Sequence, residues 1–143
     1  MPREIALELP HLTLAALAWG DPALPPLLAV HGWLDNAASF SALAPLLAAR
    51  FHVVAIDLPG HGRSAHRAPG TWYHYVDYLG DLAGAVAALG WQRFTLLGHS
   101  LGGAVASAYA AAHPERVGRL LLVESLGPLT QAPEAALEQL RKG

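Results

Sequence analysis

The chain has 143 residues, of which 53% are hydrophobic and 14% are charged, and its formal net charge is −2. This composition excludes intrinsic disorder, which requires low hydrophobicity and a high net charge, and the length suits a single domain. The small net charge and the lack of a long run of like charges argue against nucleic acid and anionic membranes as partners. The chain has no cysteine, so disulfides, thiol catalysis and cysteine-ligated metals are excluded.

Membrane, metal and cofactor classes are also disfavoured. No apolar run reaches the length of a transmembrane helix, about 18 residues. Residues 1–4 lead into a short alternating stretch rather than a signal sequence. The histidines show no pair with zinc-ligand spacing on one helix face. We therefore expect a cytoplasmic protein with no membrane partner, no metal and no cofactor.

Six segments have the patterns of β-strands. Residues 5–9 and 12–17 alternate apolar with polar or small residues, which predicts two half-buried strands. Short apolar runs bounded by turn residues are typical of buried strands in a parallel sheet. Such runs occupy residues 27–30, 51–56, 94–97 and 120–123.

The segments between the apolar runs have helical periodicity. Residues 37–49 are interrupted by Pro45, which predicts a kink or two short helices. Residues 101–113 form a helical segment closed by Pro114. A shorter helix is predicted over residues 134–141.

The segment before Gly90 has the clearest amphipathic pattern. Gly90 is predicted to end this helix. Asp77 and Asp81 lie off the apolar stripe, which consists of Val76, Leu79, Leu82, Val86 and Leu89. Strands and helices therefore alternate along the chain, which predicts an α/β fold with a mostly parallel sheet and right-handed crossovers.

A G-x-S-x-G motif lies between an apolar strand and a helix. This context allows a sharp turn that lifts the Ser100 hydroxyl above the sheet edge. The turn requires small neighbours, and the free N–H groups of the next helix favour negative charge beside the serine. Ser100 is therefore the predicted nucleophile, with the Leu101 N–H as an oxyanion donor. The supporting residues of the turn are Gly98, His99, Gly102 and Gly103.

A second loop follows the run at residues 27–30. We assign the other oxyanion donor to the Trp33 backbone N–H, because the loop after this strand supplies it in such sheets. Gly32 allows close backbone approach. For His31 a structural role is favoured over proton transfer. The Trp33 ring either lines the pocket or simply packs.

Residues 60–65 fit G-x-G-x-x-A, a dinucleotide-binding signature. That signature must open a helix, whereas Pro69 and Gly70 follow here and break one. A tight loop packed beside the serine turn is therefore the preferred interpretation.

Three motifs together resemble the α/β-hydrolase superfamily. They are H-G-W-L-D-N at residues 31–36, D-L-P-G-H-G-R-S at residues 57–64 and G-H-S-L-G-G at residues 98–103. With G-W-Q-R-F at residues 90–94, the chain is similar to serine hydrolase-like proteins over residues 5–127. The resemblance implies an α/β-hydrolase-type, mostly parallel sheet with helices on both faces. Residues 1–127 would be the N-terminal part of the core and residues 128–143 the start of a lid or cap.

The resemblance also implies residues that this sequence does not supply. The family is roughly twice as long, and its triad runs nucleophile, acid, histidine, so the C-terminal part of the fold and the lid are expected to be missing. His113 lies a helix length from Ser100, about 18–20 Å, and the His99 side chain is expected to point away. Glu124 is either the triad acid or a structural carboxylate. A serine where dehalogenases and epoxide hydrolases use aspartate favours acyl transfer.

Three functions therefore remain open. The preferred one is a serine hydrolase acting on small esters or related acyl substrates, inactive as this chain alone because the general base is missing. The alternatives are a non-catalytic fragment or pseudoenzyme that needs a partner chain, and a cofactor-free peroxidase on the same scaffold. We also expect the uncovered strand at residues 120–123 to favour a homodimer or association with a C-terminal half.

Overall fold

In a computed structural model, which describes residues 1–124, the chain forms one six-stranded sheet. The strands are β1 (Arg3–Glu8), β2 (Thr13–Trp19), β3 (Pro26–Val30), β4 (His52–Ile56), β5 (Phe94–His99) and β6 (Val117–Val123). The helices are a 3-10 turn η1 (Ala37–Phe40), α1 (Ala44–Leu47), α2 (Asp77–Leu89) and α3 (Leu101–Ala112). The predicted helix at residues 134–141 and the predicted lid at residues 128–143 lie outside the described residues.

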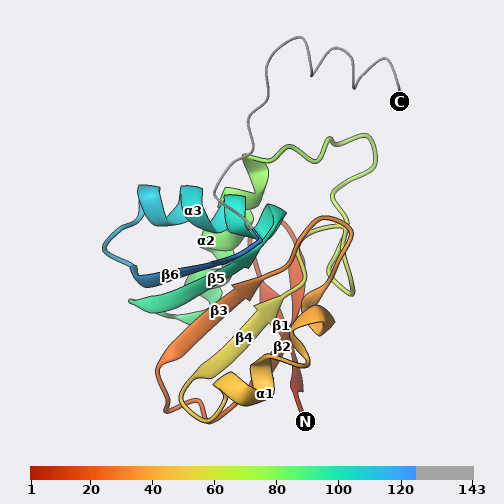
Figure 1. Cartoon of the computed structure of the whole chain (residues 1–143). Coiled ribbons are helices and arrows are strands. Elements are labelled where there is room, and N and C mark those ends of the chain that lie inside the picture. Colours follow the sequence, from red (N-terminus) through yellow and green to blue (C-terminus); the bar gives the residue numbers. More distant parts are fainter. Residues whose placement is uncertain (125–143) are drawn as a thin grey trace.

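The sheet has the order β1-β2-β4-β3-β5-β6. Strands β1 and β2 form an antiparallel hairpin, and β2 pairs antiparallel with β4. The other three pairings, β4 with β3, β3 with β5 and β5 with β6, are parallel. The predicted mostly parallel α/β sheet is therefore confirmed, with the antiparallel hairpin at one edge (Figure 1).

Helices cover both faces of the sheet because the central strands alternate their side chains between two cores. On one face Leu28, Val54 and Leu96 pack against α2 and α3. On the other face Leu27 and Val53 belong to a smaller core with residues of η1 and α1. Figure 1 shows α2 and α3 on one side of the sheet and α1 on the other. Because these strands are buried on both faces, their sequences are continuous apolar runs.

Two local predictions about helix ends are confirmed. The segment at residues 37–49 divides into η1 and α1, and Pro45 lies in the first turn of α1, where its missing N–H leaves no helical bond unmade. At the end of α2, Gly90 has a φ of 70° and its N–H returns to the carbonyl groups of Ala87 and Val86. This left-handed cap is the position that glycine favours.

The predicted apolar stripe of α2 is wrong at two positions. Val76 precedes the helix and is exposed, whereas Asp81 is buried among Tyr78, Leu82 and their neighbours. The face that packs against the sheet is thus rotated towards Asp81. Sequence periodicity assigned Asp81 to the solvent because a lone carboxylate is rarely buried.

Asp81 is buried with two partners. Its carboxylate lies 2.5 Å from the Arg67 guanidinium and 2.8 Å from His11 Nε2. The Arg67 guanidinium also lies over the rings of Tyr73 and Tyr78. Burial opposes the charge on Arg67, but the hydrogen bond and charge of Asp81 outweigh it and raise the pKa of Arg67. This cluster fixes the long segment before α2, because loss of Asp81 would leave the Arg67 guanidinium buried without a counter-ion.

Strand β6 forms one edge of the sheet. Leu120, Leu121, Leu122 and Val123 are each at least 36% exposed, although edge strands are usually protected by charges. No described strand pairs with the outer side of β6. Within residues 1–124, no helix is long and apolar enough to cross a membrane. Among the described residues, the outer edge of β6 is therefore unpaired and can pair with another strand.

We expect the 143-residue chain to self-associate through β6, because an apolar strand with unpaired backbone groups templates further pairing. Leu121→Lys should reduce the association by placing a charge on that edge, and light scattering measures the change. The control is Leu46→Lys, since Leu46 is 76% exposed on α1, which Figure 1 shows away from β6. A parent chain that is a monodisperse monomer would contradict the prediction.

Candidate active site

The candidate site lies where the parallel strands end. Because these strands run in one direction, the loops after β3, β4, β5 and β6 meet at one edge of the sheet. His31 follows β3, Asp57 follows β4, Ser100 follows β5 and Glu124 follows β6. The carboxyl edge of a parallel sheet is the usual location of ligand sites in α/β folds.

Ser100 has the strained backbone of a tight strand-to-helix turn. Its φ is 54° and its ψ is −115°, outside the conformations that residues with side chains favour. Its N–H donates to the carbonyl of Val123 over 3.1 Å. Such strain persists only where the surroundings fix it, and it is concentrated at functional sites.

The glycines of the motif make the turn sterically feasible. A Cβ on Gly98 would lie 2.5 Å from the carbonyl oxygen of Gly102 and 2.6 Å from the Cα of Gly103. A Cβ on Gly102 would lie 2.2 Å from the carbonyl oxygen of Val30 and 2.5 Å from that of His31. The first turn of α3 therefore packs directly on the backbone at the end of β3, which a larger residue prevents.

The same packing brings the Gly32 loop to the serine. A Cβ on Gly32 would lie 3.3 Å from the Cβ of Ser100. Trp33 follows Gly32, and Leu101 is the first residue of α3. Within residues 1–124 neither the Trp33 N–H nor the Leu101 N–H donates to another backbone or side-chain group. Among residues 1–124 both predicted oxyanion donors are therefore without a hydrogen-bond acceptor, and their role stays a prediction.

His31 holds the Gly32 loop to the loop after β4. It is fully buried, its Nδ1 donates to the carbonyl of Gly32 over 2.7 Å, and its Nε2 accepts from the N–H of Leu58 over 2.9 Å. A carbonyl can only accept and an amide can only donate, so these partners define a neutral ring with its proton on Nδ1. Burial lowers the pKa of His31, which favours this neutral form. Both nitrogens are occupied, so the ring has a structural role.

Asp57 organises the loop after β4. One carboxylate oxygen accepts from the N–H of Ala37 over 2.6 Å, and the other accepts from the N–H of Arg63 over 2.9 Å. Gly62 has a φ of 51°, and a Cβ there would meet the Asp57 carboxylate at 2.3 Å. Residues 60–65 thus form turns rather than a helix start, as expected for a tight loop and not for a dinucleotide-binding signature.

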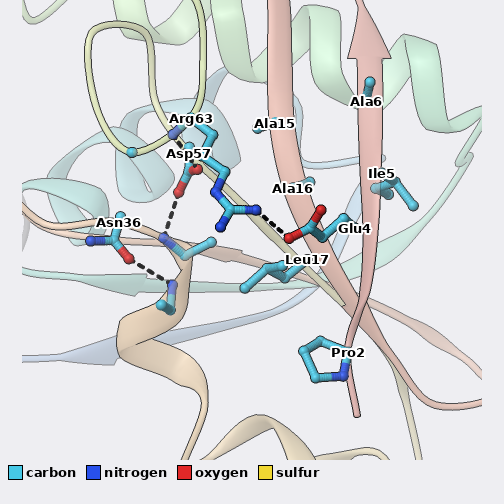
Figure 2. Close-up of a pocket in the computed structure, with 13 residues that line it drawn as sticks. Pro2, Glu4, Ile5, Ala6, Ala15, Ala16, Leu17, Asn36, Asp57 and Arg63 are labelled. Atoms are coloured by element: carbon cyan, nitrogen blue, oxygen red, sulfur yellow. Dashed lines mark hydrogen bonds and ion pairs between the residues drawn. The ribbon is translucent and has the colours of Figure 1, made fainter.

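A cavity of about 710 Å³ lies beside Asp57, between the β1–β2 hairpin and η1 (Figure 2). The main polar groups that line it are already paired. Asp57 binds two backbone amides, Asn36 accepts from the N–H of Ala38, and Arg63 pairs with Glu4. Residues 98–103 of the serine turn are not part of its lining. This cavity is therefore separate from the serine site.

His99 and Glu124 form a polar pair next to the serine. His99 Nε2 lies 3.1 Å from the Glu124 carboxylate, and the Glu124 side chain is 80% exposed. Glu124 has a φ of 52°, directly after β6. Together with the bond from Ser100 N–H to Val123, this pair joins the end of β6 to the serine turn.

The described residues bring no general base to Ser100. Among residues 1–124, no histidine forms a hydrogen bond with the Ser100 hydroxyl. His113 caps the far end of α3, where its Nδ1 lies 3.6 Å from the Glu115 carboxylate. In the same residues no cluster of three histidine, aspartate or glutamate side chains could hold a metal ion.

Sequence analysis missed two features of the site region. One is the Asp81–Arg67–His11 cluster that fixes the segment before α2. The available signal in the sequence was the position of Asp81, directly before Leu82 on the apolar stripe of the predicted helix. The other is Leu34, which has a left-handed φ of 59° and is 78% exposed. No sequence pattern signals this conformation, because residues other than glycine and asparagine rarely adopt it.

Comparison with known proteins agrees with this fold. A family model described as alpha/beta hydrolase fold matches residues 25–142. The chain therefore belongs to the α/β-hydrolase fold family. The sequence is 45% identical over 122 residues to the serine hydrolase-like protein of Homo sapiens. The matched region covers 85% of this chain and 60% of that protein.

Solved structures give the same result. A hypothetical protein from Pseudomonas aeruginosa PAO1 is 48% identical with a TM-score of 0.86, over 96% of this chain and 49% of that one. The thioesterase domain from the curacin biosynthetic pathway is 35% identical with a TM-score of 0.86, and the match covers 99% of this chain and 50% of that one. The chain spans about half the length of these structures.

The neutral state of His31 predicts a dependence of stability on pH. The pKa of His31 is lowered in the folded chain from its ordinary value of 6.5, so below pH 6.5 the unfolded chain binds a proton that the folded chain resists. The contribution of the neutral His31 ring to the free energy of unfolding is complete above pH 6.5. It declines as the pH falls from 6.5 towards the pKa of His31 in the folded chain, by at most about 1.4 kcal/mol per pH unit. Chemical denaturation between pH 8 and pH 5 measures this decline.

The His31→Gln variant should lack the part of the stability decline that His31 causes. The control His66→Gln, a change at an exposed histidine, should retain it. Parallel pH profiles for the parent chain and His31→Gln would show that His31 does not resist protonation in the fold.

Proposed function

We propose that the protein is a serine hydrolase of carboxylic esters or related acyl substrates, with Ser100 as its nucleophile. The observation that carries this proposal is the backbone of Ser100, held at a φ of 54° between β5 and α3 with Gly32 packed against its Cβ. A non-glycine residue in this conformation requires a reason, and exposure of a reactive hydroxyl at a sheet edge provides one. The thioesterase named above and the names of the serine hydrolase-like relatives support the same chemical class.

The proposed reaction follows from the groups around Ser100. The Ser100 oxygen attacks the substrate carbonyl carbon while its proton passes to a general base outside the described residues. The negative charge on the carbonyl oxygen is stabilised by the N–H groups of Leu101 and Trp33, each worth about 2.7–4 kcal/mol of the barrier. The tetrahedral intermediate then breaks its C–O bond to the leaving group, and the departing alkoxide takes the proton from the base and leaves as the alcohol. The acyl-enzyme that remains is hydrolysed by water through the same steps.

For Glu124 we propose a positioning role. Its carboxylate pairs with His99 Nε2 and so links the end of β6 to the residue before the nucleophile. A triad acid instead orients the histidine that takes the proton from the nucleophile, and in residues 1–124 no histidine bonds to Ser100. The positioning role therefore has the stronger geometric support.

A non-catalytic role is the second candidate. The observation in its favour is the same lack of a hydrogen bond between Ser100 and any histidine in the described part of the chain. In that case the strained turn would be a retained structural feature of the family. The two candidates differ in one property, the reactivity of the Ser100 hydroxyl towards an electrophile.

A fluorophosphonate probe distinguishes them. We expect the chain to be labelled at Ser100, because the oxyanion donors stabilise the phosphonyl oxygen as they would a carbonyl oxygen. Added imidazole should accelerate labelling by supplying a base. Mass spectrometry locates the adduct. Ser100→Ala should abolish labelling and Ser39→Ala, at an exposed serine of η1, should preserve it.

Two results would count against the hydrolase. Undiminished labelling of Ser100→Ala would place the reactive group elsewhere. A parent chain that stays unlabelled even with imidazole, while remaining folded by circular dichroism, would favour the non-catalytic role.

A further inference from the structure

Three buried polar side-chain atoms near the Gly32 loop have no hydrogen-bond partner among residues 1–124. They are His61 Nε2, the Tyr78 hydroxyl and Arg67 Nε. The residues that carry the first two are deeply buried, since His61 is 7% exposed and Tyr78 is 2% exposed. In folded proteins most buried polar groups bond to protein or to ordered water. A group of such atoms therefore indicates a bound partner.

The side chains that carry these atoms lie against one another. The rings of His61 and Tyr78 meet edge-on, with their centroids 6.4 Å apart. The Arg67 guanidinium lies over the Tyr78 ring, 5.5 Å from its centroid. His61 belongs to the loop after β4 and Tyr78 to the first turn of α2. Although the rings are neighbours, no direct hydrogen bond joins His61 Nε2 to the Tyr78 hydroxyl. A small polar molecule between them can bond to both.

The His61 and Tyr78 atoms have complementary hydrogen-bonding roles. His61 Nδ1 lies 3.0 Å from the Pro59 carbonyl, which can only accept. The proton of the neutral ring is therefore on Nδ1, and Nε2 is an acceptor. Burial raises the pKa of Tyr78, so its hydroxyl keeps its proton and can donate. Water both donates and accepts, and a buried water molecule requires at least two polar partners. This pair of atoms supplies them.

His61 connects this polar group to the candidate active site. Its ring meets the Trp33 ring edge-on at 5.4 Å and lies 5.1 Å from the His31 ring, measured between centroids. Gly32, which lies between those two residues in the chain, packs against the Cβ of Ser100. Trp33 is 58% exposed, so its ring depends on the contact with His61 for a fixed position. A second bond, at Nε2, would prevent the His61 ring from rotating and so lock the Trp33 side chain and its backbone.

We propose that one ordered water molecule bridges His61 Nε2 and the Tyr78 hydroxyl, and that this buried water site holds Trp33 in position beside Ser100. His61 and Tyr78 are thus positioning residues, which act through Trp33 and do not touch the substrate. The effect on reactivity rests on the proposed function, because only there does the Trp33 N–H stabilise an oxyanion. The water site and its effect on the position of Trp33 do not depend on that function.

A high-resolution crystal structure of the 143-residue chain tests the water site directly. It should show one water molecule within hydrogen-bond distance of both His61 Nε2 and the Tyr78 oxygen. The Ser100→Ala variant should hold the same water molecule. A structure in which the two atoms bond directly to each other, or in which neither has a partner, would overturn the inference.

The Tyr78→Phe variant tests the same bonds in solution, because it removes the hydroxyl and keeps the ring. Loss of a hydroxyl bonded to water should lower the ratio of folded to unfolded chain about fivefold, the usual worth of one hydrogen bond. Loss of a buried hydroxyl without a partner should instead raise this ratio. Chemical denaturation measures the direction, and an increase would contradict the bridge.

The positioning role is measured at His61 and Trp33 by NMR. Tyr78→Phe should shift the ¹⁵N resonance of His61 Nε2 and the amide cross-peak of Trp33. It should also slow fluorophosphonate labelling of Ser100 by at least about tenfold, part of the hundredfold or more that one oxyanion donor is worth. The matched control is Tyr109→Phe, at a tyrosine of α3 that is 3% exposed and packs against Phe94 and His113. It should leave all three quantities unchanged.

Two results separate the inference from the proposed function. An unshifted Trp33 amide, or labelling at the parent rate, in Tyr78→Phe would overturn the positioning role. A parent chain that is not labelled at Ser100, although Tyr78→Phe shifts both resonances, would contradict the hydrolase function and leave the water site intact.

Discussion

The contact between the first turn of α3 and the end of β3 determines the geometry of the whole site. Gly102 lies so close to the carbonyl oxygens of Val30 and His31 that a Cβ would overlap both of them. Because the helix approaches this closely, the chain must turn sharply at Ser100, and Gly98 must in turn lie against the backbone of Gly102. The exposed Ser100, the Leu101 N–H that has no acceptor among residues 1–124 and the nearby Gly32 loop all follow from this approach.

Buried polar groups then fix the loops around this contact. His31 and Asp57 each bind backbone groups of neighbouring loops, so that segments far apart in sequence are held by hydrogen bonds between a side chain and the main chain. Buried backbone groups require such partners. The pair of Asp81 and Arg67 does the same for the segment before α2 through charge. The candidate site is thus built on irregular backbone that is nevertheless well fixed by these bonds.

Much of this arrangement was predictable from local sequence. Apolar runs located the central strands, Pro45 divided one helical segment, and Gly90 ended another. The serine turn was recognisable because its glycines satisfy a steric demand that few other residues meet. Periodicity failed at Asp81, because the partners that permit its burial, Arg67 and His11, are distant in sequence. The conformation of Leu34 was unpredictable for a related reason, since it opposes the local preference of the residue.

The account depends on the glycine contact more than on any other feature, and one pair of variants tests it directly. We predict that Gly102→Ala lowers the free energy of unfolding by at least about 2 kcal/mol through overpacking and abolishes phosphonylation of Ser100. Gly80→Ala on α2 has open space around its new Cβ and should raise stability by about 0.5–1 kcal/mol with reactivity unchanged. A Gly102→Ala protein as stable and as reactive as the parent chain would contradict the claim that close backbone packing creates the nucleophile site.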